Sequence, residues 1–267
     1  MFGYYGKILH IDLTERKHWV EEKAEEWYKL WIDGVAMATR LCWENIKPGC
    51  DPYSPDNPIC IANGIFAGTP VPVGAKYGLA SKSPMTNFIG DSLCGSWFSV
   101  ALKRTGWDGI VIHGASEKWV NVFVDDNRVE FRDAAKLLGL NTYQTEEAIR
   151  EALADDQVRS ATIGPAGENM VRFANVTNDG RQAGRTGHGA VWGSKKLKAL
   201  SVRGTRGISV ADANTLNKLS FDITKEAQGP YTAKYRILGT TQNVLNLNKL
   251  GLLPTRNYQE GVFEDAE

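Results

Sequence analysis

The residues best suited to chemistry lie between Arg159 and Arg206, where positive side chains are interspersed with glycines. This stretch holds nine basic and two acidic residues, a net charge of +7, although the whole chain has 31 of each kind and no net charge. It also holds eight glycines. A glycine-rich backbone with positive side chains suits a compact, multiply charged anion such as phosphate. The pattern therefore indicates a phosphate-binding stretch, with a solvated basic face as the alternative.

The residue types that commonly bind metals are scattered. The cysteines are Cys42, Cys50, Cys60 and Cys94, and the histidines are His10, His18, His113 and His188. The cysteines form no C-x-x-C pair, which argues against a zinc or iron–sulfur site made by them and predicts free thiols. Cys94 stands out because it lies in a polar segment, DSLCGS, which we expect to be a loop. No histidine has a partner at ligand-like spacing, so we expect all four to be non-catalytic.

The composition excludes several classes of protein. The chain has 267 residues, 42% of them hydrophobic and 23% charged, which is typical of one or two globular domains. A disordered chain, a collagen-like chain and a generally basic nucleic-acid binder are excluded. No apolar stretch approaches the roughly 20 residues that cross a bilayer, so we expect no membrane association. The start, MFGYYGKILHIDL, lacks the pattern of an export signal, and we expect a cytoplasmic protein.

The elements that must position these residues follow from hydrophobic periodicity. Strands are expected at 4–13, 17–22, 60–64, 76–82, 109–114, 160–165, 170–177 and 199–204, with a further hairpin over 119–133. Helices are expected at 24–32, 35–46, 146–154, 213–227 and 239–250. The change to helical character after Asp212 predicts two domains, residues 1–210 and 211–267.

A faint internal repeat relates two of these segments. Residues 94–114, CGSWFSVALKRTGWDGIVIHG, and residues 188–204, HGAVWGSKKLKALSVRG, share an order of glycine, aromatic residue, basic helix and β-branched strand. Two such units about a pseudo-two-fold axis would each offer a helix N-terminus and a glycine loop to a ligand with two phosphate arms. Coincidence between two ordinary strand–loop–helix–strand units is the alternative.

Several longer segments resemble one known family. They are IGPAGEN (163–169) with the following VRFANVTNDGRQAGRTGHGAVWGSKKLKAL, GYYGKILHIDLT (3–14), SKSPMTNF (81–88), ALKRTGWDGIVIHG (101–114) and GLLPTRNYQEGVFEDA (251–266). Over essentially its whole length the chain resembles the amino-terminal part of the tungsten-containing aldehyde:ferredoxin oxidoreductase family. Residues 74–76, GAK, and 253–257, LPTRN, are closer to the formaldehyde branch.

The resemblance implies an enzyme that oxidises aldehydes to carboxylic acids with ferredoxin as electron acceptor. It implies tungsten, or molybdenum, held by two pterins whose phosphates a magnesium ion bridges, and a 4Fe-4S cluster in the full-length enzyme that this chain does not ligate. The implied fold is α+β, with two similar β-sheets and helices in a pseudo-two-fold saddle, followed by the start of a mostly helical domain.

The same resemblance implies which residues contact the cofactor. They are Lys76, Leu93, Cys94, Gly95, Ser96, Arg181, Gln182, Ala183, Gly184 and Arg185. Many relatives have arginine at the position of Lys76, and lysine lacks its planar, two-pronged grip on phosphate. The backbone carbonyls of Leu93 and Gln182 are the expected magnesium ligands, because magnesium prefers oxygen donors.

The resemblance assigns no catalytic residue to this chain. In the family the cluster motif C-x-x-C-x-x-x-C and the groups beside tungsten lie beyond residue 267. We therefore expect a truncated chain or a split subunit, inactive alone, with the remaining C-terminal domains or a second subunit as its partner and a homo-oligomer as one possible assembly. A non-catalytic scaffold subunit or decayed paralogue is the alternative. A nucleotide-binding module is disfavoured, because G-x-x-x-x-G-K-[ST] is absent from the sequence.

Overall fold

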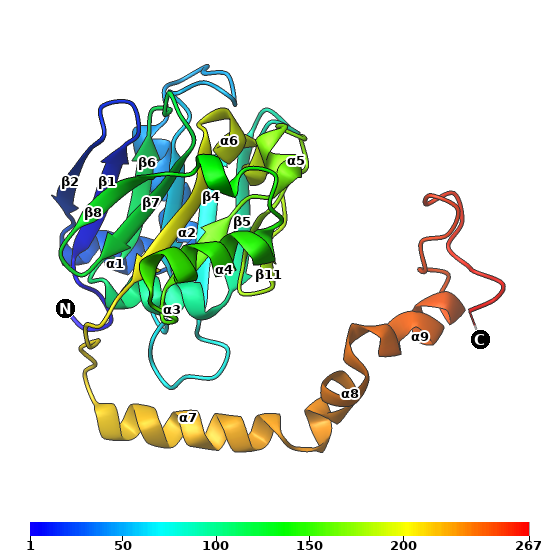
Figure 1. Cartoon of the computed structure of the whole chain (residues 1–267). Coiled ribbons are helices and arrows are strands. Elements are labelled where there is room, and N and C mark those ends of the chain that lie inside the picture. Colours follow the sequence, from blue (N-terminus) through cyan, green and yellow to red (C-terminus); the bar gives the residue numbers. More distant parts are fainter. Residues whose placement is uncertain (267) are drawn as a thin grey trace. The chain divides into compact units, whose positions relative to one another are not determined.

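The computed structural model describes residues 1–266, which form two compact units. The first spans Met1–Ala213 and the second begins at Asn214. Two mixed β-sheets of six strands each make up most of the first unit (Figure 1). The α+β class and the pair of similar sheets expected from the sequence are confirmed.

The first sheet has the strand order β2-β1-β6-β3-β4-β5. Its strands are β1 (Lys7–Asp12), β2 (Lys17–Glu22), β3 (Ile59–Asn63), β4 (Lys76–Lys82), β5 (Ile89–Gly95) and β6 (Gly109–His113). The second sheet has the order β8-β7-β12-β9-β10-β11. Its strands are β7 (Val120–Asp125), β8 (Val129–Asp133), β9 (Arg159–Thr162), β10 (Val176–Asn178), β11 (Arg181–Ala183) and β12 (Leu197–Arg203).

The second sheet repeats the first strand by strand. In each sheet the first strand in the chain pairs antiparallel with the second and parallel with the sixth. The sixth then pairs with the third, the third with the fourth and the fourth with the fifth, all antiparallel. The repeat suggested by residues 94–114 and 188–204 is therefore confirmed, and it extends over both six-stranded units.

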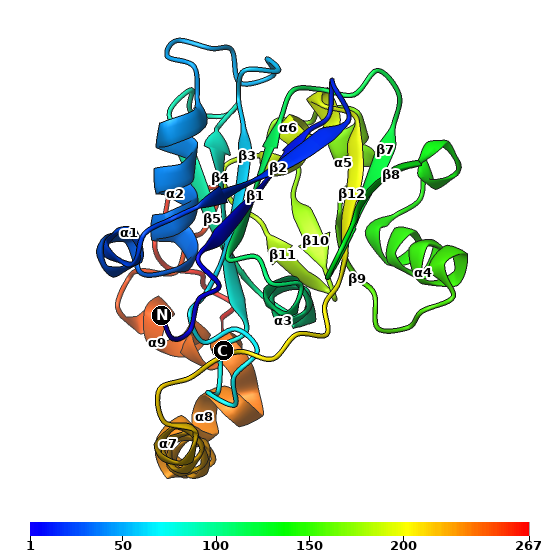
Figure 2. The ribbon, with the colours of Figure 1, turned by 90° about the vertical axis from the view of Figure 1, so that its left-hand side faces the viewer.

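Helices pack on both sheets, and two from each repeat occupy corresponding places in the chain. The helices are α1 (Glu25–Trp31), α2 (Gly34–Asn45) and α3 (Trp97–Arg104) in the first repeat, and α4 (Thr142–Leu153), α5 (Pro165–Glu168) and α6 (His188–Ser194) in the second, with a 3₁₀ turn η1 at Ala135–Leu137. Figure 2 shows α2 and α4 on the outer sides of the two sheets and α3 and α6 between the sheets. Helix α2 lies so close to β4 that a Cβ atom at Gly78 would be 2.4 Å from the carbonyl carbon of Gly34. Only glycine permits this approach.

The main core lies between the sheets. Leu9 and Ile61 of the first sheet and Val122 and Leu200 of the second are fully buried in one cluster. Phe98 of α3 belongs to the same cluster. Alternate residues of each strand point to the opposite face, where α2 and α4 cover smaller clusters. This shared core fixes the two sheets against each other.

The second unit is helical. Its elements are α7 (Ala213–Ala227), α8 (Pro230–Leu238), a 3₁₀ turn η2 (Gly239–Asn243) and α9 (Val244–Lys249). Large apolar side chains on these helices, including Phe221, Tyr231 and Ile237, are exposed. Through residue 266, no helix is both long and apolar enough to span a bilayer.

Two expectations about local structure were wrong. The strand expected over 170–177 is mostly loop. Pro165 begins the short helix α5, and after this helix the chain becomes extended again only at Val176. The DSLCGS segment is not a loop, since Leu93, Cys94 and Gly95 belong to β5, which pairs with β4 along its whole length. Gly90 and Asp91 have little intrinsic strand preference, and this pairing overrides it.

Candidate functional site

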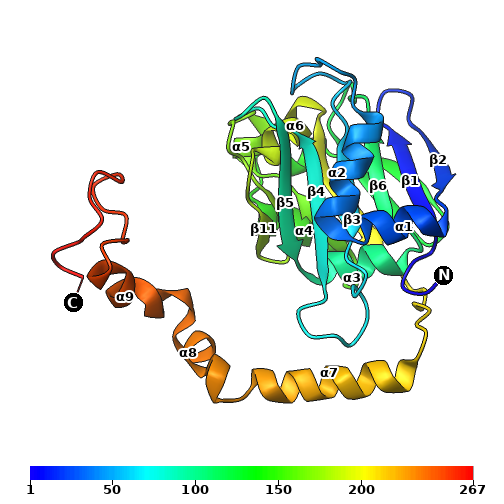
Figure 3. The same ribbon diagram turned by 180° about the vertical axis from the view of Figure 1, so that it is seen from behind.

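The two repeats meet at corresponding edges. Strands β5 and β11 end their respective sheets and lie side by side (Figure 3). The backbone N–H of Arg185 donates to Ser92 Oγ at 3.2 Å, and the Thr186 hydroxyl donates to the Asp91 carbonyl at 3.4 Å. A ligand held at this junction would therefore be met by equivalent strands from both repeats.

A pocket of about 720 Å³ opens at this junction. Seven of the ten residues expected from the sequence to contact the cofactor line it: Lys76, Leu93, Cys94, Gly95, Ser96, Arg181 and Gln182. The other three, Ala183, Gly184 and Arg185, do not line it, and Ala183 is fully buried. Val73, Ala75, Trp97 and Asp179 complete the lining. The pocket thus brings together residues more than 100 positions apart in the chain.

The two cations of the pocket are available to a ligand. Within the described part of the chain, the side chains of Lys76 and Arg181 make no hydrogen bond and no ion pair. The nearby carboxylate of Asp179 is engaged elsewhere, accepting a hydrogen bond from the Phe98 N–H at 2.9 Å and lying 3.8 Å from Arg159 Nε. The pocket therefore presents uncompensated positive charge, as an anion site requires.

The Asp179 contact lies at the first turn of α3. Ser96 is the N-cap residue of this helix, and its Oγ also accepts from the Phe98 N–H, at 3.1 Å. Asp179 itself follows β10 in a two-residue turn with Gly180, and both residues have positive φ. Asp-Gly is a typical sequence for such a hairpin turn. This dipeptide was the signal for the β10–β11 hairpin, which our strand prediction missed.

The thiol of Cys94 is buried, so it is not a reactive group of the pocket. Cys94 is only 3% exposed, and its Sγ lies 3.6 Å from the side chain of Asn178. Burial raises the pKa of this thiol. All four cysteines are free and buried, as expected from their spacing. Cys94 therefore contributes backbone atoms, not its thiol, to the pocket.

Most of the basic stretch has structural partners. Lys195 Nζ donates to the Gly114 carbonyl at 2.7 Å, and Lys198 Nζ donates to the Ile163 carbonyl at 2.7 Å and to the Glu168 carboxylate. The remaining partnered side chains of the stretch are those of Arg159, Lys196, Arg203 and Arg206. The expectation of one phosphate-binding surface over 159–206 was therefore too broad. Of its nine cations, only Arg181 lines the pocket.

One acidic residue near the site was not expected from the sequence. Glu146 of α4 is 4% exposed, and its Oε2 accepts the Asp179 N–H at 3.2 Å. Burial, with a smaller contribution from the Asp179 carboxylate, raises the pKa of Glu146 to about 7. Its Oε1 has no hydrogen-bond partner among residues 1–266. In the sequence, Glu146 is one of several acidic residues on a predicted helix, and nothing indicated that it would be buried.

This duplicated sheet, with a positively charged pocket where its edge strands meet, defines the structural class of the domain. Residues 8–204 match the N-terminal domain of aldehyde ferredoxin oxidoreductase. The chain belongs to this family.

Relatives agree with this assignment. The chain is 42% identical to the tungsten-containing aldehyde ferredoxin oxidoreductase of Thermococcus kodakarensis and 39% identical to that of Pyrococcus furiosus. Both alignments cover all of this chain and 44% of the relative, so the chain spans less than half of their length. It is 31% identical to an aliphatic sulfonate oxidoreductase, WOR-like subunit, of Pyrococcus furiosus.

A solved structure shares the fold. The active site complex BamBC of benzoyl coenzyme A reductase aligns with a TM-score of 0.82 and 30% identity, over 85% of this chain and 35% of that one. The prediction that residues 74–76 and 253–257 place the chain nearer the formaldehyde branch of the family stays a prediction.

Proposed function

We propose that this chain is the pterin-cofactor-binding portion of a cytoplasmic oxidoreductase that converts aldehydes to carboxylic acids with ferredoxin as electron acceptor. The observation that carries the proposal is the pocket between β5 and β11, which Lys76 and Arg181 line without an acidic partner among residues 1–266. The reaction and the metal, tungsten or molybdenum, are inferred from the names of the relatives.

The pocket residues fit a paired pterin. A volume of about 720 Å³ lies in the range of small-molecule sites, and two equivalent strand edges suit a ligand that is itself double. Lys76 and Arg181 would neutralise phosphate oxygens. The backbone carbonyls of Leu93 and Gln182 would supply oxygen ligands to magnesium. When bound, the metal and pterins supply the two-electron redox chemistry.

The side chains of this chain bind and orient rather than react. Ser96 caps α3, and Trp97 and Val73 offer exposed apolar surface beside the two cations. Such surface excludes water from the pocket once a ligand covers it, and charge interactions strengthen where water is excluded. The chain thus contributes position and charge, and proton transfer is left to residues outside it.

Activity needs further protein. We infer that the remaining C-terminal domains, or a second subunit, supply the cysteines of the 4Fe-4S cluster and the groups beside the metal, and that this chain alone is inactive. The lengths of the relatives support this, since each relative is more than twice as long as the region that matches this chain.

Co-expression tests the proposal. The chain is produced together with the C-terminal portion of a tungsten aldehyde ferredoxin oxidoreductase in a host that makes the cofactor, and the purified complex is analysed for tungsten, pterin phosphate and iron. We expect bound metal and pterin with aldehyde-dependent reduction of a low-potential dye. Metal and pterin at background in a well-folded complex would contradict the proposal. Bound pterin without aldehyde-dependent reduction would instead indicate a scaffold subunit.

A further inference from the structure

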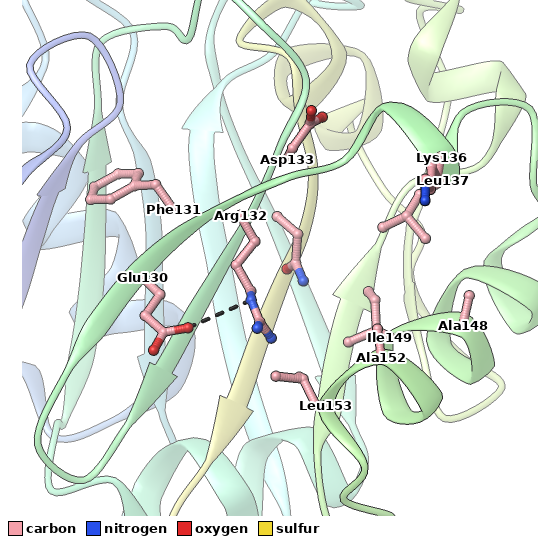
Figure 4. A pocket seen from close by; sticks show the side chains of 11 residues that line it. Glu130, Phe131, Arg132, Asp133, Lys136, Leu137, Ala148, Ile149, Ala152 and Leu153 are labelled. Carbon is pink, nitrogen blue, oxygen red and sulfur yellow. Dashed lines mark ion pairs between the residues drawn. The ribbon is translucent and has the colours of Figure 1, made fainter.

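A second cavity, of about 830 Å³, lies at the opposite edge of the second sheet from β11. It is formed between the β7–β8 hairpin and α4 (Figure 4). Its apolar wall consists of Leu137, Ile149 and Leu153, which belong to the cluster under α4, together with two alanines of that helix. Its size is within the usual range for a small-molecule site.

One polar side chain faces this cavity with an unused donor. Asn121 of β7 lines the cavity and is 4% exposed. Its Oδ1 accepts a hydrogen bond from the Ser201 hydroxyl at 2.8 Å, which fixes the orientation of the amide. The Nδ2 group makes no hydrogen bond with any described residue. This donor is open to the cavity, so it is free to bond an acceptor of a ligand.

Arg132 places a positive charge in the cavity beside the amide, and Lys136, Glu130 and Asp133 also line it. Figure 4 shows the Arg132 side chain directed into the space between the strand and α4. Arg132 Nε lies 3.5 Å from Glu130 Oε2, but Glu130 is held more closely by Arg128, at 2.7 Å. Most of the five guanidinium N–H donors of Arg132 therefore remain free. Lys136, at the rim, makes no ion pair within residues 1–266.

The first repeat is covered differently at the corresponding place. There the outer face of β1 is covered by α1, whose Tyr28 is 1% exposed and packs with Ile8 and Leu41. In the second repeat only the short turn η1 follows the hairpin, and no helix corresponding to α1 is found among the described residues. A pocket also lies at the equivalent place of the first repeat, between the β1–β2 hairpin and α2, but it is smaller, about 530 Å³, and its lining is more polar, with His10, Glu21 and Glu44.

We propose that this cavity binds a small monocarboxylate with an apolar body. The hydrocarbon portion lies against Leu137, Ile149 and Leu153, while the carboxylate accepts hydrogen bonds from Arg132 and from Asn121 Nδ2. This pairing of a planar guanidinium with a carboxylate is favourable in geometry and charge. The proposal does not depend on the cofactor pocket.

Titration of the full 267-residue chain with octanoate tests this proposal. We expect calorimetry to give a Kd below about 1 mM, and the side-chain NH₂ signals of Asn121 to shift in ¹⁵N-correlated NMR spectra. 1-Octanol, which has the same body without the charge, is expected to bind at least about tenfold more weakly. Equal affinity for the two probes, or no binding of octanoate at 10 mM, would overturn the proposal.

Two variants and a control locate the site. Arg132→Gln is expected to weaken octanoate binding at least about tenfold. Ala152→Phe, which adds a ring at the cavity from the exposed face of α4, is expected to abolish binding without unfolding the chain. Arg172→Gln removes an unpartnered arginine elsewhere and should leave the Kd unchanged. Octanoate binding that survives both cavity variants would overturn the assignment.

Discussion

The carboxylate of Asp179 accepts the backbone N–H of Phe98 at 2.9 Å, and so joins the β10–β11 turn of the second repeat to α3 of the first. Because Ser96 Oγ shares the same donor, Asp179→Ala leaves one cap in place. We expect the variant to lower the free energy of unfolding of the first unit by about 1 kcal/mol, as measured by urea denaturation.

Glu147→Ala is the matched control for that variant. Glu147 is an exposed acid on α4 that makes no hydrogen bond or ion pair among the described residues. Its loss should change stability by less than about 0.5 kcal/mol. If both variants unfold at the same urea concentration, Asp179 does not link the repeats energetically.

Removing the free cations of the pocket should reduce cofactor retention without destabilising the fold. Lys76 and Arg181 lack acidic partners in residues 1–266, so Lys76→Gln and Arg181→Gln should leave the melting temperature nearly unchanged. In the co-expressed complex, pterin phosphate per chain should fall at least about fivefold, because each variant removes a charge-assisted contact.

Arg172→Gln is the control for the cation variants, since Arg172 does not line the pocket and its side chain has no partner among the described residues. Full cofactor content in all three variants would contradict the assigned role of Lys76 and Arg181.

Lys198 should be among the residues most important for stability. Its ammonium group is fully buried and donates to the Leu140 and Ile163 carbonyls and to Glu168. Lys198→Met leaves these acceptors buried and unpaired, so we expect the free energy of unfolding to fall by about 3 kcal/mol. Lys118→Met, at an exposed position without partners in the described residues, should have little effect in the same urea titration. Similar unfolding curves for the two variants would be inconsistent with this role.

Glu146 should make stability depend on pH. Its pKa is raised to about 7 in the folded chain, so between about pH 4.5 and 7 the folded state retains a proton that the unfolded state has lost. The stabilisation is complete below that range and disappears as the pH rises through 7. The free energy of unfolding, measured relative to Glu146→Gln, should therefore fall by up to about 3 kcal/mol between pH 4.5 and 8. A difference that is constant with pH would contradict a protonated Glu146.

Alternation of apolar residues was sufficient to predict the β1–β2 and β7–β8 hairpins. The strands at the pocket between β5 and β11 were harder to predict for a physical reason. Strand β5 contains Gly90, Asp91 and Ser92, whose preferences oppose a strand, and only pairing with β4 makes them one. Conversely, Val171 and Phe173 alternate like strand residues, yet Phe173 is 70% exposed in a loop.

The resemblance named seven residues that line the pocket between β5 and β11, but composition could not show which basic residues face that pocket. Lys195 and Lys198 are indistinguishable from Arg181 by composition, and only the positions of distant carbonyl groups determine that the lysines are structural. The cavity beside Asn121 was not predicted, because it depends on how the β7–β8 hairpin packs against α4 in the folded chain.

The meeting of β5 and β11 also protects the molecule from self-association. Each strand ends its sheet, and an uncovered edge of this kind is a template for pairing with another chain. Here each repeat covers the other's vulnerable strand. A fragment cut after β6 would expose β5 along its length, so aggregation would accompany any separation of the duplicated halves.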